Sequence, residues 1–155
     1  MNTRMNANTE AFWMPFTPNR QFKSQPRLVE SAQGVAYRTP EGREILDGTS
    51  GLWCVGAGHR HPKIAEAMKR QIDTLDFASS FQVGHAGAFE LAERIGALAP
   101  PGLDRVFFTN SGSEAIDTAL KIALAVARAT GQGQKNLFIG RERGFHGVGF
   151  GGISV

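Results

Sequence analysis

The stretch RVFFTNSGSEAIDTALKIALAVARAT, residues 105–130, decides the fold. Its first four residues, 105–108, are an arginine followed by one β-branched and two aromatic residues, and this largely apolar run predicts a short strand. Residues 111–130 then predict a long helix that is apolar over most of its circumference and is therefore buried against a sheet. A second apolar run at 137–139 predicts another strand. Strand, helix and strand within about 35 residues indicate a βαβ unit, with the two strands parallel and neighbouring.

Toward the N-terminus, residues 62–75 and 86–99 carry apolar side chains at helical spacing, and Pro62 occupies the first position of its helix. Residues 28–47 predict a small antiparallel meander, with a turn at Thr39-Pro40-Glu41-Gly42. The aromatic-containing segment 11–27 predicts irregular chain.

The sequence thus predicts an α/β fold in two parts. Residues 1–60 form an N-terminal segment with the small meander. Residues 61–155 form the first part of a larger α/β domain, with an incomplete mixed or parallel sheet. The last residues, 151–155, are apolar, and a single βαβ unit leaves sheet edges open, so we expect the sequence to be a piece of a longer protein.

Composition narrows the classes of function. The chain has 155 residues, 41% of them hydrophobic and 20% charged, with a formal net charge of +3. The charges are scattered, which disfavours nucleic-acid binding, and no apolar run is long enough for a membrane span. The only cysteine, Cys54, excludes an internal disulfide. With a polar N-terminus, this favours a cytoplasmic protein.

Asn110-Ser111-Gly112-Ser113-Glu114 follows the first predicted strand and begins the long helix. One interpretation is a capping box, with Ser111 at the N-cap and Glu114 three residues later. Another is a phosphate cradle, because a helix N-terminus offers free N–H groups and the positive end of its dipole. Gly112 would allow close approach of an anion, and the Ser113 hydroxyl could donate a further hydrogen bond.

Gly144-Phe145-His146-Gly147 follows the second predicted strand. It is either an ordinary surface loop or a planar group that stacks on a flat ligand. If both strand ends bind the same molecule, one supplies a phosphate site and the other a stacking ring. That combination suits a flat, phosphorylated cofactor.

The glycine-dense segment 51–62 contains two histidines, His59 and His61, which are too few ligands for a metal site. Trp53 is either part of a core or the wall of a pocket. Cys54 has no base partner in the sequence pattern, so a buried or pocket-wall thiol is favoured over a nucleophile.

Three segments carry a resemblance to a known family: GLWCVGAGHRHP at 51–62, ELAERIGALAPPGLDRVFFTNSGSEAIDTALKIA at 90–123 and RERGFHGVGFGG at 141–152. Together the chain resembles, from about Trp13 to Val155, a class III aminotransferase of the fold type I pyridoxal-phosphate enzymes. The motif Trp13-Met14-Pro15-Phe16 with Asn19-Arg20, together with Gly51-Leu52-Trp53, looks like the branch that uses β-alanine or other omega-amino acids with pyruvate.

The resemblance implies roles for particular residues. Pyridoxal 5'-phosphate would be bound through Ser111, Gly112, Ser113, Phe145 and His146, with Phe145 stacking on the pyridine ring where many relatives have tyrosine. The substrate would meet Trp53, Leu52, Phe12 and Phe81. The resemblance implies no metal.

The family's Schiff-base lysine and the carboxylate that keeps the ring nitrogen protonated come well after the aromatic-His-Gly motif. None of the lysines present lies in a matching motif; they are Lys23, Lys63, Lys69, Lys121 and Lys135. The resemblance therefore implies a full-length homodimeric enzyme and an isolated chain that is inactive. Two alternatives stay open: another class III enzyme, such as an aminomutase or an ornithine-type transaminase, and a non-catalytic, truncated phosphate-binding module.

Overall fold

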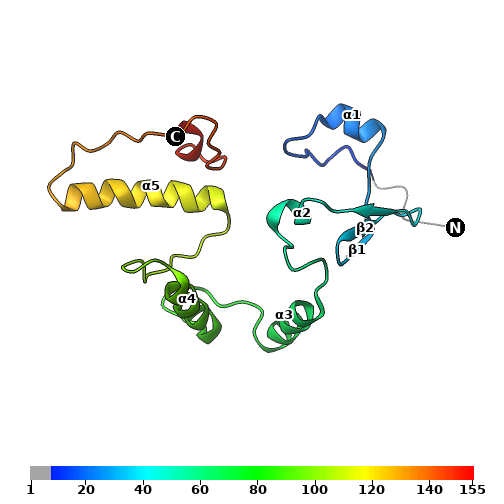
Figure 1. The fold of residues 1–155 in the computed structure, drawn as a ribbon, viewed down its shortest axis with the longest axis horizontal. Coiled ribbons are helices and arrows are strands. Elements are labelled where there is room, and N and C mark those ends of the chain that lie inside the picture. The colour runs from blue at the N-terminus through cyan, green and yellow to red at the C-terminus, as the bar shows by residue number, and fades with distance from the viewer. Residues whose placement is uncertain (1–7) are drawn as a thin grey trace. The chain divides into compact units, whose positions relative to one another are not determined.

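The structure is a computed structural model, and it describes residues 8–155. The chain divides into two compact units, the first ending at Ser79 and the second beginning at Ser80. The first unit contains a three-stranded sheet and three helices, and the second contains two helices and a final 3₁₀ turn (Figure 1).

The sheet of the first unit is the predicted meander. Strands β1 (Ser31–Gln33), β2 (Ala36–Arg38) and β3 (Glu44–Leu46) pair antiparallel in the order β1-β2-β3. The register places Ala32 opposite Tyr37 and Tyr37 opposite Ile45. These three central residues share one face, because residues paired directly opposite each other point to the same side of a sheet. All three are partly covered.

The turn predicted at residues 39–42 is confirmed. The N–H of Gly42 donates to the Thr39 carbonyl oxygen at 2.9 Å, and the N–H of Thr39 donates to the carbonyl of Arg43 at 2.9 Å. Gly42 has φ 83°, a value that glycine adopts without steric cost. The first strand begins at Ser31 and not, as predicted, at Leu28.

Helix α3 (Pro62–Thr74) begins with proline at its first position, as predicted. The prediction of irregular chain over 11–27 is wrong in part, because a short helix, α1 (Asn19–Ser24), lies within it. The side chain of Asn19 closes the loop before α1: it accepts from the Met14 N–H at 2.8 Å and donates to the Met14 carbonyl at 2.8 Å. The short α2 (Ser50–Trp53) was not predicted at all.

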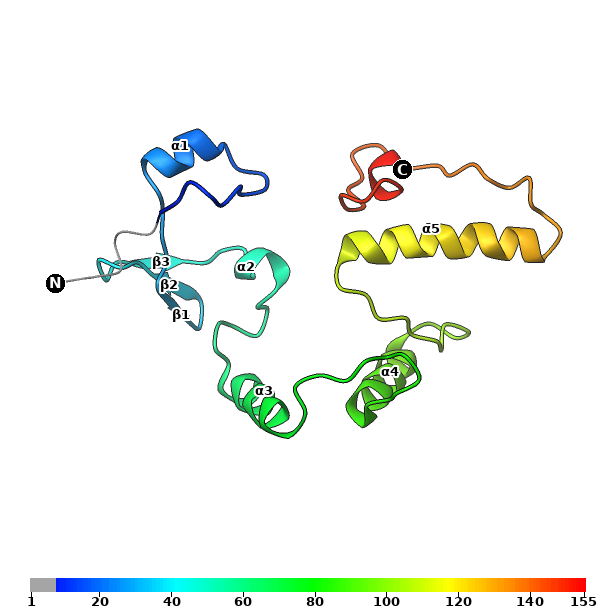
Figure 2. The same cartoon turned by 180° about the vertical axis from the view of Figure 1, so that it is seen from behind.

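In the second unit, the two predicted helices are confirmed as α4 (Ala86–Leu98) and α5 (Gly112–Ala129). After α5 the chain runs back alongside that helix toward the 3₁₀ turn η1 (Gly152–Ser154), as both views show (Figures 1 and 2). Phe138 joins Leu120 and Leu124 of α5 in lining an open cavity of about 410 Å³. Helix α5 and the second apolar segment therefore line the same open cavity.

The predicted pair of neighbouring parallel strands is wrong. Residues 105–108 and 137–139 form no ladder with each other or with any other part of residues 8–155. A strand requires partners for its N–H and C=O groups, and local β-propensity does not supply them.

Apolar side chains are poorly covered throughout the described chain. Among residues 8–155 no hydrophobic residue is buried, and Ile122 and Val126 of α5 are half exposed, against the prediction that this helix is buried. The accessible surface is 13951 Å². Two separate globules of half this mass would together expose about 9,200 Å². The chain therefore carries apolar surface suited to contact with further protein.

Candidate functional site

The N-terminus of α5 has the predicted cap at Ser111, and Glu114 reaches back one residue beyond the N-cap, to Asn110. The Ser111 Oγ accepts a hydrogen bond from the Glu114 N–H at 3.1 Å, and the Glu114 carboxylate accepts from the Asn110 N–H at 2.9 Å. Ser111 has extended backbone angles, φ −157° and ψ 162°, which are usual for an N-cap.

The cap leaves other donors of the first turn available. The N–H groups of Gly112 and Ser113 have no partner within the helix, because the first four N–H groups of any α-helix lack one. The Ser113 Oγ accepts from the Val148 N–H at 2.9 Å, so its own hydrogen remains available for donation. A Cβ added to Gly112 would find no protein atom within 4 Å, so the space beside that residue is open. The donors and the open space fit an anion.

The loop after the second apolar segment packs directly on this turn. A Cβ on Gly147 would lie 2.6 Å from both the Cα and the Oγ of Ser113, and Gly147 has φ 100°. Only glycine satisfies both the spacing and the backbone angle. Glycine at this position therefore allows the loop to approach α5 closely.

Asp117, one turn further along α5, fixes the rest of the loop. Its Oδ1 accepts from the Gly152 N–H at 2.8 Å. A Cβ on Gly151 would lie 3.1 Å from the same oxygen, and a Cβ on Gly149 would overlap the Asp117 carboxylate. The motif GFHGVGFGG is thus spaced to lie against two successive turns of one helix.

The two predicted cofactor loops therefore meet at Ser113, although the strands expected to bring them together are absent from the described residues. Phe145 lies three residues before the Val148 contact, and its side chain is 71% exposed. His146 lines a second open cavity, of about 290 Å³, with residues of α5 and the segment 138–141. Whether the Phe145 ring faces the N–H groups of Gly112 and Ser113 stays a prediction.

In the first unit, α2 is an unusual turn that presents two of the predicted substrate residues. Ser50, Gly51, Leu52 and Trp53 all have positive φ, at 51°, 60°, 56° and 70°. They form one left-handed turn, closed by a hydrogen bond from the Trp53 N–H to the Thr49 carbonyl at 3.0 Å. Left-handed geometry costs about 1–2 kcal/mol for each non-glycine residue. Surrounding contacts must therefore hold this turn in place.

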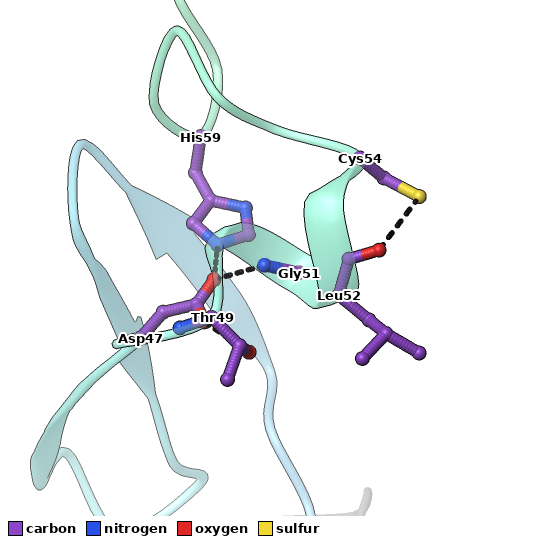
Figure 3. Close-up of polar contacts among 6 residues, drawn as sticks. All are labelled: Asp47, Thr49, Gly51, Leu52, Cys54 and His59. Atoms are coloured by element: carbon purple, nitrogen blue, oxygen red, sulfur yellow. Dashed lines mark hydrogen bonds and ion pairs between the residues drawn. The ribbon is translucent and has the colours of Figure 1, made fainter. Parts of the chain in front are cut away.

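Asp47 supplies those contacts (Figure 3). Its Oδ2 accepts from the Gly51 N–H at 2.6 Å and lies 2.7 Å from the His59 Nε2. Its Oδ1 accepts from the N–H and the hydroxyl of Thr49, each at 3.1 Å. The Asp47 side chain is only 4% exposed, so solvent screens these bonds little.

The surroundings of Asp47 shift two pKa values. Burial tends to raise the pKa of Asp47, but the hydrogen bonds from His59, Thr49 and Gly51 outweigh it and lower that pKa to about 2. Tyr37 lies beside the pair, with its ring centroid 4.5 Å from that of His59. Burial, and next the charge of Asp47, raises the pKa of Tyr37.

The sequence singled out Leu52 and Trp53 but missed Asp47, and it considered His59 only as a metal ligand. The signal that could have found Asp47 is the run Asp47-Gly48-Thr49, since an aspartate before a turn often accepts from N–H groups two residues on. Residues 8–155 contain no group of three or more His, Cys, Asp or Glu side chains suited to a metal ion.

The remaining predicted residues are all surface-accessible. Leu52 is 67% exposed and Trp53 is 85% exposed, and Phe12 and Phe81 are also exposed. Phe12 belongs to the first unit and Phe81 to the second. Cys54 is exposed too, which contradicts a buried thiol; its Sγ lies 3.5 Å from the Leu52 carbonyl oxygen. No helix in the described part of the chain is both long and apolar enough to cross a membrane.

Comparison with known proteins identifies the family. The family model described as "Aminotransferase class-III" matches residues 18–155. The chain belongs to the class III aminotransferases. Among its class III relatives, the omega-aminotransferase of Caulobacter vibrioides is 64% identical over 146 residues, which cover 94% of this chain and 33% of the relative. The beta-alanine–pyruvate aminotransferase of Pseudomonas aeruginosa is 49% identical, covering 96% of this chain and 33% of that protein.

Solved transaminase structures agree with this family. The crystal structure of a transaminase from the marine bacterium Virgibacillus superposes with a TM-score of 0.88 at 32% identity, over 94% of this chain and 34% of that one. The predicted family and the fold type I α/β fold are confirmed. Family membership implies dependence on pyridoxal phosphate. The chain spans about a third of the length of the class III relatives it matches.

Proposed function

We propose that this chain is part of a longer transaminase that uses pyridoxal phosphate to move the amino group of an omega-amino acid, such as β-alanine, to pyruvate. The names of the Caulobacter and Pseudomonas relatives support the reaction. The single structural observation that carries the proposal is the contact at Ser113, where the Val148 N–H of the aromatic loop meets the first turn of α5 at 2.9 Å.

The residues at this junction fit the cofactor. The N–H groups of Gly112 and Ser113 and the Ser113 hydroxyl would hold its phosphate at the positive end of α5, while Ser111 caps the helix. Phe145 would stack on its ring, and His146 would shape the site beside it. When bound, the cofactor accepts electrons as the amino donor loses a proton. Leu52, Trp53, Phe12 and Phe81 are the residues that we propose contact the substrate.

The uncovered apolar surface supports a larger assembly. Trp13 and Phe16 are exposed at 86% and 87%, in a loop that has no core of its own. We propose that such surfaces are covered by the rest of a longer polypeptide and by a second subunit in a homodimer. This chain alone would then be inactive. We also propose a cytoplasmic location, which a single exposed cysteine suits.

We define the full-length enzyme as the longer polypeptide that contains the chain, or as a hybrid in which the chain replaces the matching third of the Caulobacter omega-aminotransferase. The first measurements are its affinity for pyridoxal phosphate and its rate of amino transfer to pyruvate from β-alanine and from ornithine. Turnover of β-alanine supports the proposal. A preference for ornithine indicates the ornithine-type alternative, and binding without turnover indicates a non-catalytic module.

One pair of alanine substitutions tests the phosphate site. In Gly112→Ala the new methyl group meets no protein atom, and alanine at this helix position is tolerated. We expect the dissociation constant for pyridoxal phosphate to rise about tenfold, since a weakened charge-assisted hydrogen bond is worth about 1.5–3 kcal/mol. The melting temperature of the cofactor-free enzyme should not fall.

The matched control is Gly133→Ala, just beyond the other end of α5, where a Cβ makes only an ordinary 3.6 Å contact with Arg128. It should leave cofactor affinity unchanged. Equal affinities in wild type and Gly112→Ala would contradict the phosphate assignment.

A further inference from the structure

We propose that Asp47 and His59 are positioning residues that hold α2 in its left-handed form and thereby set which amino donors the enzyme accepts. The identity of the donors rests on the function proposed above. The support given to α2 by Asp47 and His59 rests only on contacts within the first unit.

The bonds to the Asp47 carboxylate fix the course of the backbone at α2. The carboxylate accepts from Gly51, in the middle of the left-handed turn, and from Thr49, immediately before it, at 2.6 Å and 3.1 Å (Figure 3). Both N–H groups point at one side chain only when the backbone takes this course. Loss of the carboxylate removes acceptors for both.

Asp47 is itself attached to the meander. The Asp47 N–H donates to the Val35 carbonyl at 2.8 Å, just before β2. His59, its partner at 2.7 Å, exchanges two backbone hydrogen bonds with Gly34, at 2.8 Å and 3.0 Å. Both residues are therefore rooted in the turn between β1 and β2, and the Tyr37 ring of β2 packs against His59. Asp47 and His59 thus connect α2 to the meander.

The left-handed turn orients the side chains that α2 carries. Leu52 and Trp53 are largely exposed, so side-chain packing restrains them little. Their directions therefore depend on the backbone angles of the turn. If α2 relaxed to ordinary negative φ, both side chains would point elsewhere while the rest of the first unit remained in place.

The kinetic test compares Asp47→Ala and Asp47→Asn in the full-length enzyme. Asp47→Ala should raise KM for β-alanine about tenfold or more, and it should change the ratio of kcat/KM for β-alanine to that for 1-phenylethylamine, a bulkier donor. The affinity for pyridoxal phosphate and the value of kcat should change by less than about threefold. Asp47→Asn keeps one acceptor oxygen and should lie between wild type and Asp47→Ala.

Two variants of His59 and a control at Glu44 separate positioning from general stability. His59→Ala should change the ratio of kcat/KM for β-alanine to that for 1-phenylethylamine. His59→Gln keeps a hydrogen-bonding N–H near Asp47 and should restore the wild-type ratio. Glu44→Gln, at an exposed carboxylate on the neighbouring strand β3, should match wild type in every measurement. If stability falls in the Asp47 variants while KM and the donor ratio stay at wild-type values, the proposal is overturned.

Hydrogen exchange tests whether Asp47 holds α2 without relying on transaminase activity. In wild type the amide of Gly51 should exchange slowly because Asp47 protects it, and in Asp47→Ala a peptide covering 50–55 should exchange faster while a peptide from α5 does not change. If wild type shows no transamination, the proposed function fails, yet this comparison still decides whether Asp47 holds α2. Unchanged exchange at 50–55 would overturn the positioning role.

Discussion

The first turn of α5 and the left-handed turn α2 both present candidate binding groups, but they are held by different means. At the first turn of α5, Gly147 fits against Ser113 because there is no room for a side chain between the two backbones. At α2 a single buried carboxylate gathers donors from Thr49, Gly51 and His59. The contact between Gly147 and Ser113 is steric, although the Asp117 carboxylate also accepts from Gly152 in the same loop. The support of α2 comes instead from hydrogen bonds that converge on one carboxylate.

Of the substitutions considered, we expect the largest effect at Gly147, where the contact with α5 is steric. Gly147→Ala places a methyl group 2.6 Å from Ser113 and forces a non-glycine residue to φ 100°. The backbone angle and the overlap each cost about 1–3 kcal/mol. We expect the melting temperature of the full-length enzyme to fall by several degrees and pyridoxal phosphate binding to be lost.

The control for this variant is Gly56→Ala in the first unit. A methyl group added to Gly56 would meet no atom within 4 Å, and the φ of this glycine is not positive. The variant should have the melting temperature of wild type and the same affinity for pyridoxal phosphate. A Gly147→Ala enzyme that keeps wild-type cofactor affinity would show that the loop can move away from α5 without consequence.

A smaller effect is expected at the cap of α5. Ser111→Ala removes the acceptor for the Glu114 N–H and should lower the free energy of unfolding by about 1 kcal/mol. Ser111→Asp keeps an acceptor at the N-cap and should retain most of that stability. Denaturant unfolding of the full-length enzyme measures both. Equal losses in the two variants would show that the hydroxyl contributes something other than the cap.

The longer helices and the cap of α5 were largely predictable from local signals. The cap at Ser111 follows from the serine and the glutamate three residues later, and α3 and α4 follow from prolines and apolar periodicity. The convergence of two loops at Ser113 was also expected, but for the wrong reason. The prediction relied on a pair of parallel strands to bring the loops together. In the structure, the glycines of 147–152 allow the second loop to lie against α5.

The support of α2 could not be predicted in the same way. Neither Leu52 nor Trp53 has any preference for positive φ, so no local propensity indicates a left-handed turn. Its cause lies in Asp47 and in His59, twelve residues later, which meet only after the meander has formed. The missing ladders at 105–108 and 137–139 have a similar origin, since a strand depends on partners outside its own sequence.

The finest test of the comparison is acid, because protonation should release α2 and leave the contact between Gly147 and Ser113 intact. Asp47 has a pKa of about 2 in the folded chain, below the ordinary value of 3.8. A depressed carboxyl pKa contributes stability that is fully present above the ordinary value and is lost as the pH falls through the folded value.

The protection of the 50–55 amides, measured by hydrogen exchange and corrected for intrinsic rates, should therefore be constant above about pH 4. Between about pH 4 and pH 2 it should decline toward the level of Asp47→Asn. Protection of the Val148 amide should not follow that course, because it donates to the neutral hydroxyl of Ser113 and not to a carboxylate. A parallel decline at both places over this pH range would show that the two turns are held by the same forces after all.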